Sequence, residues 1–129
     1  MNFPEDLKYS KEHEWVRVSG NIATIGISDY AQDQLGEIVF VELPDEGEEF
    51  EKDDAFGVVE SVKSVNDIYA PLSGRIVEVN DPVVDSPEIV NEDPYAEGWL
   101  VKIEISDPKE LGELMSAKDY EAYIKEESE

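Results

Sequence analysis

Lys63 is the side chain whose surroundings in this sequence best suit chemistry. It stands between two short valine-rich runs in the stretch FGVVESVKSVNDIYAPLSGRIVEV, residues 56–79. Both runs favour β-strands, and the turn between them falls around Lys63 and Ser64. A lysine at the tip of a hairpin is held away from the body of a protein. We therefore expect its amine to be open to an approaching enzyme.

The local charge around Lys63 also differs from that of the rest of the chain. The sequence has 33 acidic and 10 basic residues, which gives a formal net charge of −23. Residues 37–54 hold nine acids and one lysine, whereas residues 55–79 hold three acids, one lysine and one arginine. A weakly charged tip suits a lysine that is presented to several partners. A solvated surface lysine is the simpler alternative.

Few other side chains offer a reactive group. The chain has no cysteine, which removes disulfides, thiolate nucleophiles and the usual zinc sites. His13 is the sole histidine, and a structural role beside Trp15 is favoured, because one imidazole without cysteine partners makes a poor metal site. The sequence contains no G-x-S-x-G motif and no phosphate-binding glycine loop. These absences argue against an independent enzyme.

The acidic composition restricts the classes of partner. A chain with this charge repels nucleic-acid phosphates and anionic membrane surfaces, so neither is expected as a ligand. Partners with basic patches are expected instead, because the charge would speed their encounter. No apolar run approaches the roughly 20 residues that a membrane span needs. The first residues lack the apolar region of a signal peptide, so we expect a cytoplasmic protein.

Alternating apolar and polar residues predict several short β-strands. The segment EWVRVSGNIATIGIS predicts a hairpin whose turn is SGN at 19–21. Further strands are expected at 38–43, on both sides of Lys63, and at 98–106. Many short strands with turn signals favour a small β-sandwich or barrel. Aromatic strand residues are expected in the core or half-buried, among them Phe40, Tyr69 and Trp99.

Few helices are expected. A short helix should start at Ser28 or the next residue, and Gly36 should end it in the left-handed conformation. Residues 80–95 hold three prolines and several Asp and Asn residues, which predicts mostly loop with one short helical turn. Asp107 and Ser116 are N-cap signals for two helices near the end of the sequence.

One short pattern occurs twice. The segments GEIVFV at 36–41 and GRIVEV at 74–79 share the pattern G-x-I-V-x-V. Two matching strands indicate two similar half-sheets that are related by approximate symmetry. Chance similarity between short strands is the alternative.

Four segments, in order, resemble the H-protein family of the glycine cleavage system, and the resemblance covers nearly the whole chain. LKYSKEHEWV resembles the opening of that family, ATIGISDYAQDQLGEIVFVELP its central part, GVVESVKSVNDIYAPLSGRIVEVN its lipoyl-attachment segment and GWLVKIEIS its late strand. Biotin carriers normally have methionines on both sides of their lysine, where this chain has Val62 and Ser64. Lipoyl domains of 2-oxo acid dehydrogenases are closer, but they usually lack the HEW opening and the C-terminal helices.

The resemblance implies a mainly β fold, a barrel-sandwich hybrid with short flanking helices and a C-terminal helical segment. It implies one carrier domain over residues 1–129, with a core at about 14–106 and C-terminal helices at about 107–126. It also implies that lipoate is joined to Lys63 by an amide. Glu60 and Ser61 match the family's flanks of that lysine and are expected to help the lipoate-attaching enzyme recognise the tip; ordinary strand-edge polarity is the alternative.

Glu14 and Asp67 match family positions expected near the docked arm, where carboxylates can hold an ammonium group. A solvated loop carboxylate and a turn-capping aspartate are the simpler alternatives. Two positions depart from the family pattern, because Glu12 stands where many members have a small hydroxyl residue and Gln34 where many have histidine. Both are expected near the surface on which the arm docks, so the details of that surface are open.

The family's function, carried over to this chain, is that of a shuttle and not of a catalyst. The lipoyl arm accepts an aminomethyl group from a pyridoxal-phosphate glycine decarboxylase and delivers it to an aminomethyltransferase for tetrahydrofolate. A dihydrolipoamide dehydrogenase then reoxidises the arm. A monomer is expected, because the carrier visits several active sites. Two alternatives stay open: a lipoyl-relay protein that donates lipoate to other enzymes, and an unmodified acidic interaction module.

Overall fold

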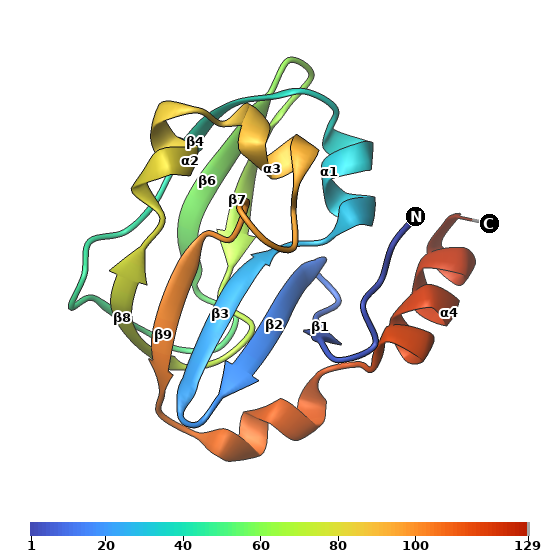
Figure 1. The fold of residues 1–129 in the computed structure, drawn as a ribbon. Helices are drawn as coiled ribbons and strands as arrows, with labels where there is room; N and C mark the ends of the chain where they lie inside the picture. The colour runs from blue at the N-terminus through green and yellow to red at the C-terminus, as the bar shows by residue number, and fades with distance from the viewer. Residues whose placement is uncertain (129) are drawn as a thin grey trace.

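Two antiparallel β-sheets pack against each other in the computed structural model, which describes residues 1–128 (Figure 1). The larger sheet has the strand order β1-β2-β3-β9-β8-β5, and the smaller sheet has the order β4-β6-β7. The strands are β1 Lys8–Tyr9, β2 Glu14–Ser19, β3 Ile22–Ile27, β4 Ile38–Glu42, β5 Glu49–Phe50, β6 Ala55–Ser61, β7 Val65–Tyr69, β8 Gly74–Val79 and β9 Val101–Ile105. The expected hairpin is β2–β3, whose turn holds Gly20 at a φ of 63°.

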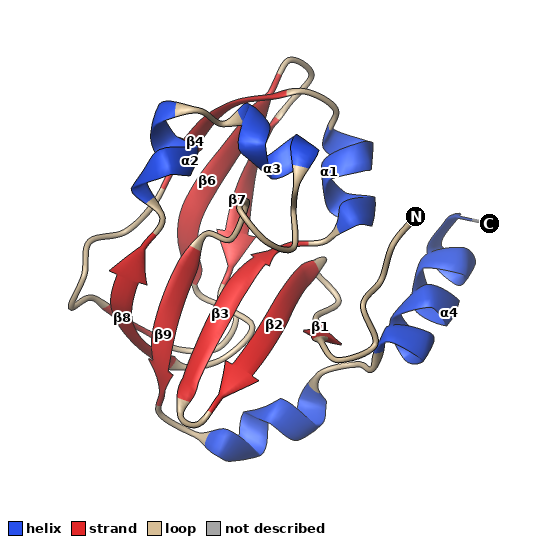
Figure 2. Ribbon diagram, viewed as in Figure 1, coloured by secondary structure: helices blue, strands red, loops and turns tan. Residues whose placement is uncertain are grey.

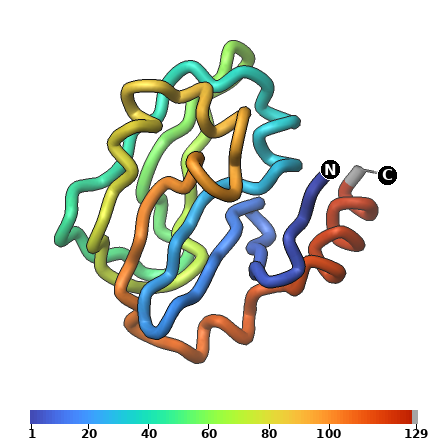
Figure 3. The backbone as a smooth tube through the Cα atoms, in the orientation of Figure 1, coloured from blue at the N-terminus to red at the C-terminus, as the bar shows by residue number. Residues whose placement is uncertain are grey.

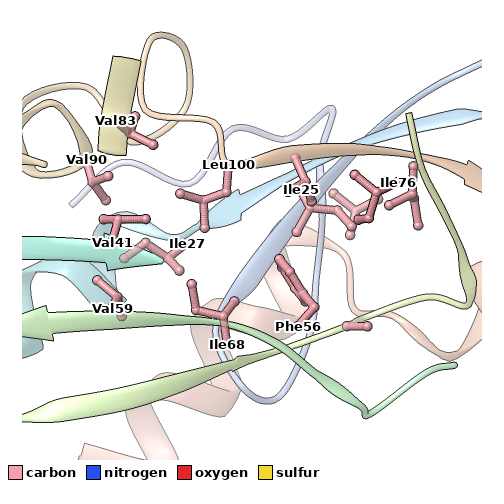
Figure 4. Close-up of a cluster of buried hydrophobic side chains, with 14 of the residues drawn as sticks. Ile25, Ile27, Val41, Phe56, Val59, Ile68, Ile76, Val83, Val90 and Leu100 are labelled. Carbon is pink, nitrogen blue, oxygen red and sulfur yellow. The ribbon is translucent and has the colours of Figure 1, made fainter. Parts of the chain in front are cut away.

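The main core lies between the two sheets. Ile25 and Ile27 of β3 meet Val41, Val59 and Ile68 from the three strands of the smaller sheet (Figure 4). Ile25 and Ile27 both point into this core because alternate residues of a strand lie on the same face of the sheet. All five side chains are buried. Burial of one such side chain contributes about 1.5–3 kcal/mol, so this layer accounts for much of the stability of the fold.

The short helices that lie between β3 and β9 in the sequence gather at the end of the sandwich that carries the β6–β7 turn (Figure 2). Helix α1, Asp29–Leu35, begins as predicted, because the Oγ of its N-cap Ser28 accepts a hydrogen bond from the backbone N–H of Ala31 at 3.1 Å. Gly36 ends it, but with φ 81° and ψ −156° rather than the predicted left-handed helical conformation. This region of backbone space is essentially restricted to glycine.

The segment after β8 contains more helix than expected. Two short helices occur, α2 Asp81–Asp85 and α3 Glu88–Glu92, where the sequence predicts one helical turn. Two of its prolines stand at helix starts: Pro82 is in the first turn of α2, and Pro87 precedes α3. Proline fits there because the first N–H groups of a helix have no partner within it.

The end of the described chain follows the predicted caps. Asp107 accepts a hydrogen bond from the N–H of Lys109 at 3.1 Å and begins the 3-10 helix η1, Pro108–Glu113. The Oγ of Ser116 accepts one from the N–H of Asp119 at 3.2 Å, at the start of α4, Ala117–Ser128.

A second buried cluster joins the N-terminal segment to α4. The two run side by side in the tube view (Figure 3). The rings of Tyr9 and Tyr120 stack with centroids 4.6 Å apart, and the N–H of Tyr9 donates to the carbonyl of Met115 at 2.8 Å. The cluster consists of Leu7, Tyr9, Trp15, Tyr95, Ala117, Tyr120 and Ile124. It anchors the two ends of the described chain on the outside of the larger sheet.

The two G-x-I-V-x-V segments lie in different sheets, as β4 and β8. Each strand has an irregularity at the same place in the pattern: between Ile38 and Phe40 where β4 pairs with β6, and between Ile76 and Glu78 where β8 pairs with β9. A bulge bends its strand and increases the local twist. The two half-sheets are therefore bent at matching points.

One aromatic prediction is wrong. Phe40 is 45% exposed, and it lies beside Glu60 in the register of β4 and β6. The bulge in β4 shifts its register, and Phe40 points out of the sandwich while Val41 fills the core. Tyr69 and Trp99 are half-buried as predicted.

Candidate functional site

Lys63 lies at the apex of the β6–β7 turn, where the sequence places it. Ser61 orders this turn: its N–H donates to the carbonyl of Ser64 at 2.8 Å, and its Oγ accepts hydrogen bonds from the N–H groups of Lys63 and Ser64, both at 3.1 Å. A serine hydroxyl that bonds nearby backbone in this way stabilises a turn. Ser61 is itself buried. Its structural effect is therefore to fix the backbone on which Lys63 stands.

The tip is also joined to the segment between α1 and β4. The N–H of Val62 donates to the carbonyl of Glu37 at 3.1 Å. The side chain of Lys63 lies over Gly36, since a Cβ added to this glycine would stand 3.1 Å from Lys63 Cε and 3.7 Å from its Nζ. Lys63 is exposed, and none of the salt bridges formed within residues 1–127 includes it. Its side chain is therefore accessible from solvent.

Glu60 lies on the outer face of the smaller sheet, not in the cavity described next. It pairs in register with Phe40 on one side and Val65 on the other, and both neighbours are exposed. Glu60 thus lies between two exposed apolar side chains, three residues before Lys63 in the sequence.

A cavity of about 480 Å³ opens beside the tip and reaches from α1 to β7. At its near end Leu35 adjoins Gly36, over which Lys63 lies, and Asn66 begins the β7 wall. It contains Glu14 and Asp67, the two carboxylates predicted from the sequence, and both positions that depart from the family pattern, Glu12 and Gln34. Its wall includes Glu12, His13, Glu14, Ile27, Tyr30, Ala31, Gln34, Leu35, Val59, Asn66, Asp67, Ile68, Tyr69 and Glu127.

Glu14 is the most deeply buried of these carboxylates, with 2% of the residue exposed. Burial raises the pKa of its carboxyl to about 7, while hydrogen bonds from the Ser10 hydroxyl and the Tyr69 backbone act in the opposite direction. Ser10 Oγ donates to Glu14 Oε1 at 2.6 Å and accepts from the N–H of Glu14 at 3.0 Å. Burial disfavours the charged form, whereas a cation in the cavity would favour it.

Asp67 is exposed, and its β7 strand is an edge of the smaller sheet. It pairs in register with Val58, so it borders a second depression on the outer face as well as the cavity. The structure thus places Glu14 at the floor of the cavity and Asp67 at its rim.

His13 and Glu127 are cavity residues for which the sequence predicted no such role. His13 Nδ1 lies 2.9 Å from the hydroxyl of Tyr120, and its Nε2 lies 3.3 Å from a carboxylate oxygen of Glu127. The hydroxyl of Tyr120 in turn lies 2.6 Å from Ser28 Oγ, which caps α1. These contacts join positions more than 90 residues apart, so no local pattern could predict them. The expected structural role of His13 fits this network.

The described part of the chain, residues 1–128, contains no group of His, Cys, Asp or Glu residues arranged to hold a metal ion. None of its helices is long and apolar enough to cross a membrane.

Comparison with known proteins agrees with this arrangement. The family model described as "Glycine cleavage H-protein" matches residues 7–127. The chain is 60% identical to the glycine cleavage system H protein of Carboxydothermus hydrogenoformans, over 98% of this chain and 97% of that protein. It is also 60% identical to that of Oceanobacillus iheyensis, over 98% and 100%. The crystal structure of the H protein from Mycobacterium marinum has a TM-score of 0.87 at 36% identity, covering 98% of this chain and 100% of that one.

Two bent sheets that present one lysine on a turn define a lipoyl-domain-like carrier with the predicted barrel-sandwich architecture. The chain belongs to the glycine cleavage H-protein family. It is a lipoyl-carrier component of the glycine cleavage system and not a catalyst, and it works with other components of that system.

Proposed function

We propose that Lys63 is the residue that carries lipoate, joined by an amide to its Nζ. The observation that carries this proposal is the position of Lys63: an exposed amine on an ordered turn, free of ion pairs within residues 1–127, beside a cavity. Formation of the amide removes the charge of the lysine, which suits the weakly charged surroundings of the tip. Bound lipoate supplies a dithiolane that takes up and releases groups by thiol–disulfide chemistry, which this chain without cysteine cannot supply.

The acidic cavity is proposed to hold the cationic amine of the loaded carrier. Glu14 would accept a charge-assisted hydrogen bond at the floor, and Asp67 would accept one at the rim. Ser10 holds the Glu14 carboxylate in place through its 2.6 Å hydrogen bond. The apolar wall residues, such as Ile27, Val59 and Ile68, would limit the access of water to the carried group. Glu12 supplies a further carboxylate at this surface, and Gln34 supplies an amide.

The flanks of the lysine are proposed to serve the enzyme that attaches lipoate. Ser61 presents the lysine by ordering the turn, and Glu60 offers a carboxylate between two exposed apolar residues. A partner with an apolar surface and a basic group would match this face. The net charge of −23 would speed the encounter with such a partner.

The specific partners follow from the family and are part of the proposal. They are a pyridoxal-phosphate glycine decarboxylase, an aminomethyltransferase, a dihydrolipoamide dehydrogenase and a lipoate-attaching enzyme. One domain that acts as a monomer is the state proposed for a carrier that visits all of them. A cytoplasmic location stays a prediction from the sequence. Reconstitution with the first three enzymes and tetrahydrofolate should give glycine-dependent reduction of NAD only when the carrier is lipoylated.

Intact mass spectrometry tests the attachment site. The protein is incubated with a lipoate ligase, lipoate and ATP, beside a Lys63→Arg variant and an acceptor known to work with that ligase. We expect a gain of one lipoyl mass that is absent from the variant. A modified Lys63→Arg protein would show that another lysine is the acceptor. No gain with either of two ligases that modify the control acceptor would favour the unmodified interaction module.

A further inference from the structure

One side chain, Asn91 of α3, holds both ends of the short segment that joins α1 to β4. Its Nδ2 donates to the carbonyl of Gly36 at 2.8 Å and to Gln32 Oε1 at 2.9 Å. Its Oδ1 accepts from the N–H of Ile38 at 2.8 Å. Asn91 therefore uses both hydrogens and the oxygen of its amide, and it pairs with the backbone on both sides of Glu37.

The residue between these two bonds is the one that meets the tip. The carbonyl of Glu37 accepts the hydrogen bond from the N–H of Val62, next to Lys63. Gly36, whose carbonyl Asn91 binds, lies under the Lys63 side chain. The segment held by Asn91 thus touches the tip twice, once at its backbone and once at the lysine.

The conformation of this segment depends on contacts with another element, and α3 provides them from a fixed position. Gly36 has φ 81° and ψ −156°, a conformation that persists only where surrounding contacts hold it. Val90, adjacent to Asn91, is completely buried and points into the main core (Figure 4). Because the core fixes Val90, the backbone that carries Asn91 is fixed as well.

We propose that Asn91 is a positioning residue for Lys63. It sets the place of Glu37 and Gly36, and through them the orientation of the tip relative to the acidic cavity. This role concerns the geometry of the tip, and its meaning for lipoate rests on the proposed attachment to Lys63. Loss of the Asn91 amide should leave the sandwich folded while the tip opens more often from the body.

Hydrogen exchange of the unmodified full chain, measured amide by amide by NMR, tests this role without any lipoate. The tip is reported by the Val62 amide, and the reference is the Tyr9 amide of β1, at an edge of the larger sheet, which donates to the carbonyl of Met115. The variants are Asn91→Ala, which removes all three bonds, and Asn91→Asp, which keeps an acceptor for Ile38 and loses both donated bonds. The matched control is Asn80→Ala, because the Asn80 amide likewise donates two hydrogen bonds, to the carbonyls of Glu97 and Trp99.

We expect the exchange rate of Val62 relative to Tyr9 to rise roughly fivefold or more in both Asn91 variants, the factor that loss of one ordinary hydrogen bond produces. The ratio should stay at the wild-type value in Asn80→Ala. An unchanged ratio in the Asn91 variants, or the same rise in the Asn80 control, would overturn the proposal. If Asn91→Ala does not fold, the isosteric Asn91→Asp variant decides alone by the same ratio.

A second measurement links the tip to the proposed attachment. The initial rate of lipoylation is compared between wild type, Asn91→Asp and Asn80→Ala, and only the Asn91 variant should be slower. If Lys63 proves not to be the acceptor, the exchange experiment still decides whether Asn91 positions the tip. If Lys63 is the acceptor and the Val62 ratio does not change, the attachment stands and the role of Asn91 fails.

Discussion

The hydroxyl of Ser61 accepts hydrogen bonds from two consecutive N–H groups, those of Lys63 and Ser64, at 3.1 Å each. A turn closed by a side chain needs no Asn-Gly pair, which explains how the β6–β7 hairpin forms without that signal. The lysine is therefore exposed on a backbone that is itself ordered. The order of the turn backbone and the exposure of the Lys63 side chain are separate properties of this site, so a variant can change one and leave the other unchanged.

Replacement of Ser61 tests the order of the tip. Ser61→Ala should lower the free energy of unfolding by about 1–2 kcal/mol and slow lipoylation several-fold, because two N–H groups lose their acceptor. Ser61→Thr, which keeps the hydroxyl, should be lipoylated faster than Ser61→Ala. The control is Ser73→Ala, since Ser73 also accepts from a backbone N–H, that of Lys52 at 2.9 Å, and lies elsewhere. Equal lipoylation rates in the two alanine variants would contradict the role given to Ser61.

Gly36 and Gly47 form a second matched pair. Both have positive φ, 81° and 95°, so alanine should cost each about 1–3 kcal/mol of stability. Only at Gly36 does the added Cβ meet another group, Lys63 Cε at 3.1 Å, whereas nothing lies within 4 Å at Gly47. Chemical denaturation should show similar losses for the two variants. Lipoylation kinetics should change only in Gly36→Ala, and a change of the same size in Gly47→Ala would show a general effect of instability.

The buried carboxyl of Glu14 predicts a dependence of stability on pH. Its pKa is about 7 in the folded protein and 4.5 in the unfolded chain, so the folded state binds the proton more tightly between these values. Stability from this group is therefore complete below pH 4.5 and is lost as pH rises to about 7. The shift corresponds to about 3 kcal/mol. Above pH 7 the contribution of Glu14 no longer changes.

Urea denaturation of wild type and Glu14→Gln at several pH values measures this effect. The neutral amide cannot ionise, so the variant should gain stability relative to wild type as the pH rises from 4.5 to 7. The comparison with wild type removes the repulsion among the other carboxylates, which both proteins share. Glu42→Gln, at an exposed position on β4, serves as the control. A stability difference between Glu14→Gln and wild type that does not vary with pH would show that the Glu14 carboxyl does not titrate in this range.

The two cavity carboxylates should protect the loaded carrier together. In the double variant Glu14→Gln plus Asp67→Asn, loss of the carried group to water should be several-fold faster, because two acceptors for a cationic amine are gone. The measurement is the decay of the loaded mass with time at pH 7.5. Asp119→Asn plus Glu121→Gln removes the same number of carboxylates from exposed positions of α4. Identical decay in the two double variants would exclude Glu14 and Asp67 from this role.

Local features of the site could be predicted from the sequence. The apex at Lys63 follows from strand patterns on both sides, and the N-caps at Ser28 and Ser116 follow from residue type alone. Resemblance to a family, not spacing, predicts Glu14 and Asp67 near the docked arm, and in the structure both line one cavity. Glu14 is buried because Ser10, Tyr69 and their elements enclose it, and no local pattern shows this burial.

The remaining features depend on contacts between distant segments. Asn91 binds the backbone of residues that lie 53 and 55 positions earlier, in a region where prolines and acids predicted mostly loop. The exposure of Phe40 depends on a bulge, and a one-residue change of register turns a side chain to the other face. Long-range hydrogen bonds and register shifts of this kind depend on how distant segments pair, so the sequence of one segment does not predict them.

The stacked pair of Tyr9 and Tyr120 holds α4 against the N-terminal segment, and this has a consequence for local opening of the protein. The buried residues of the main core lie within residues 16–103, before η1 and α4. His13, by contrast, contacts Tyr120 and Glu127, which lie 15 and 22 positions after Ile105, the end of β9. Release of α4 would therefore remove one wall of the acidic cavity while the sandwich and the Lys63 turn keep their contacts, so exposure of the amine and shelter of a charged group can be lost separately.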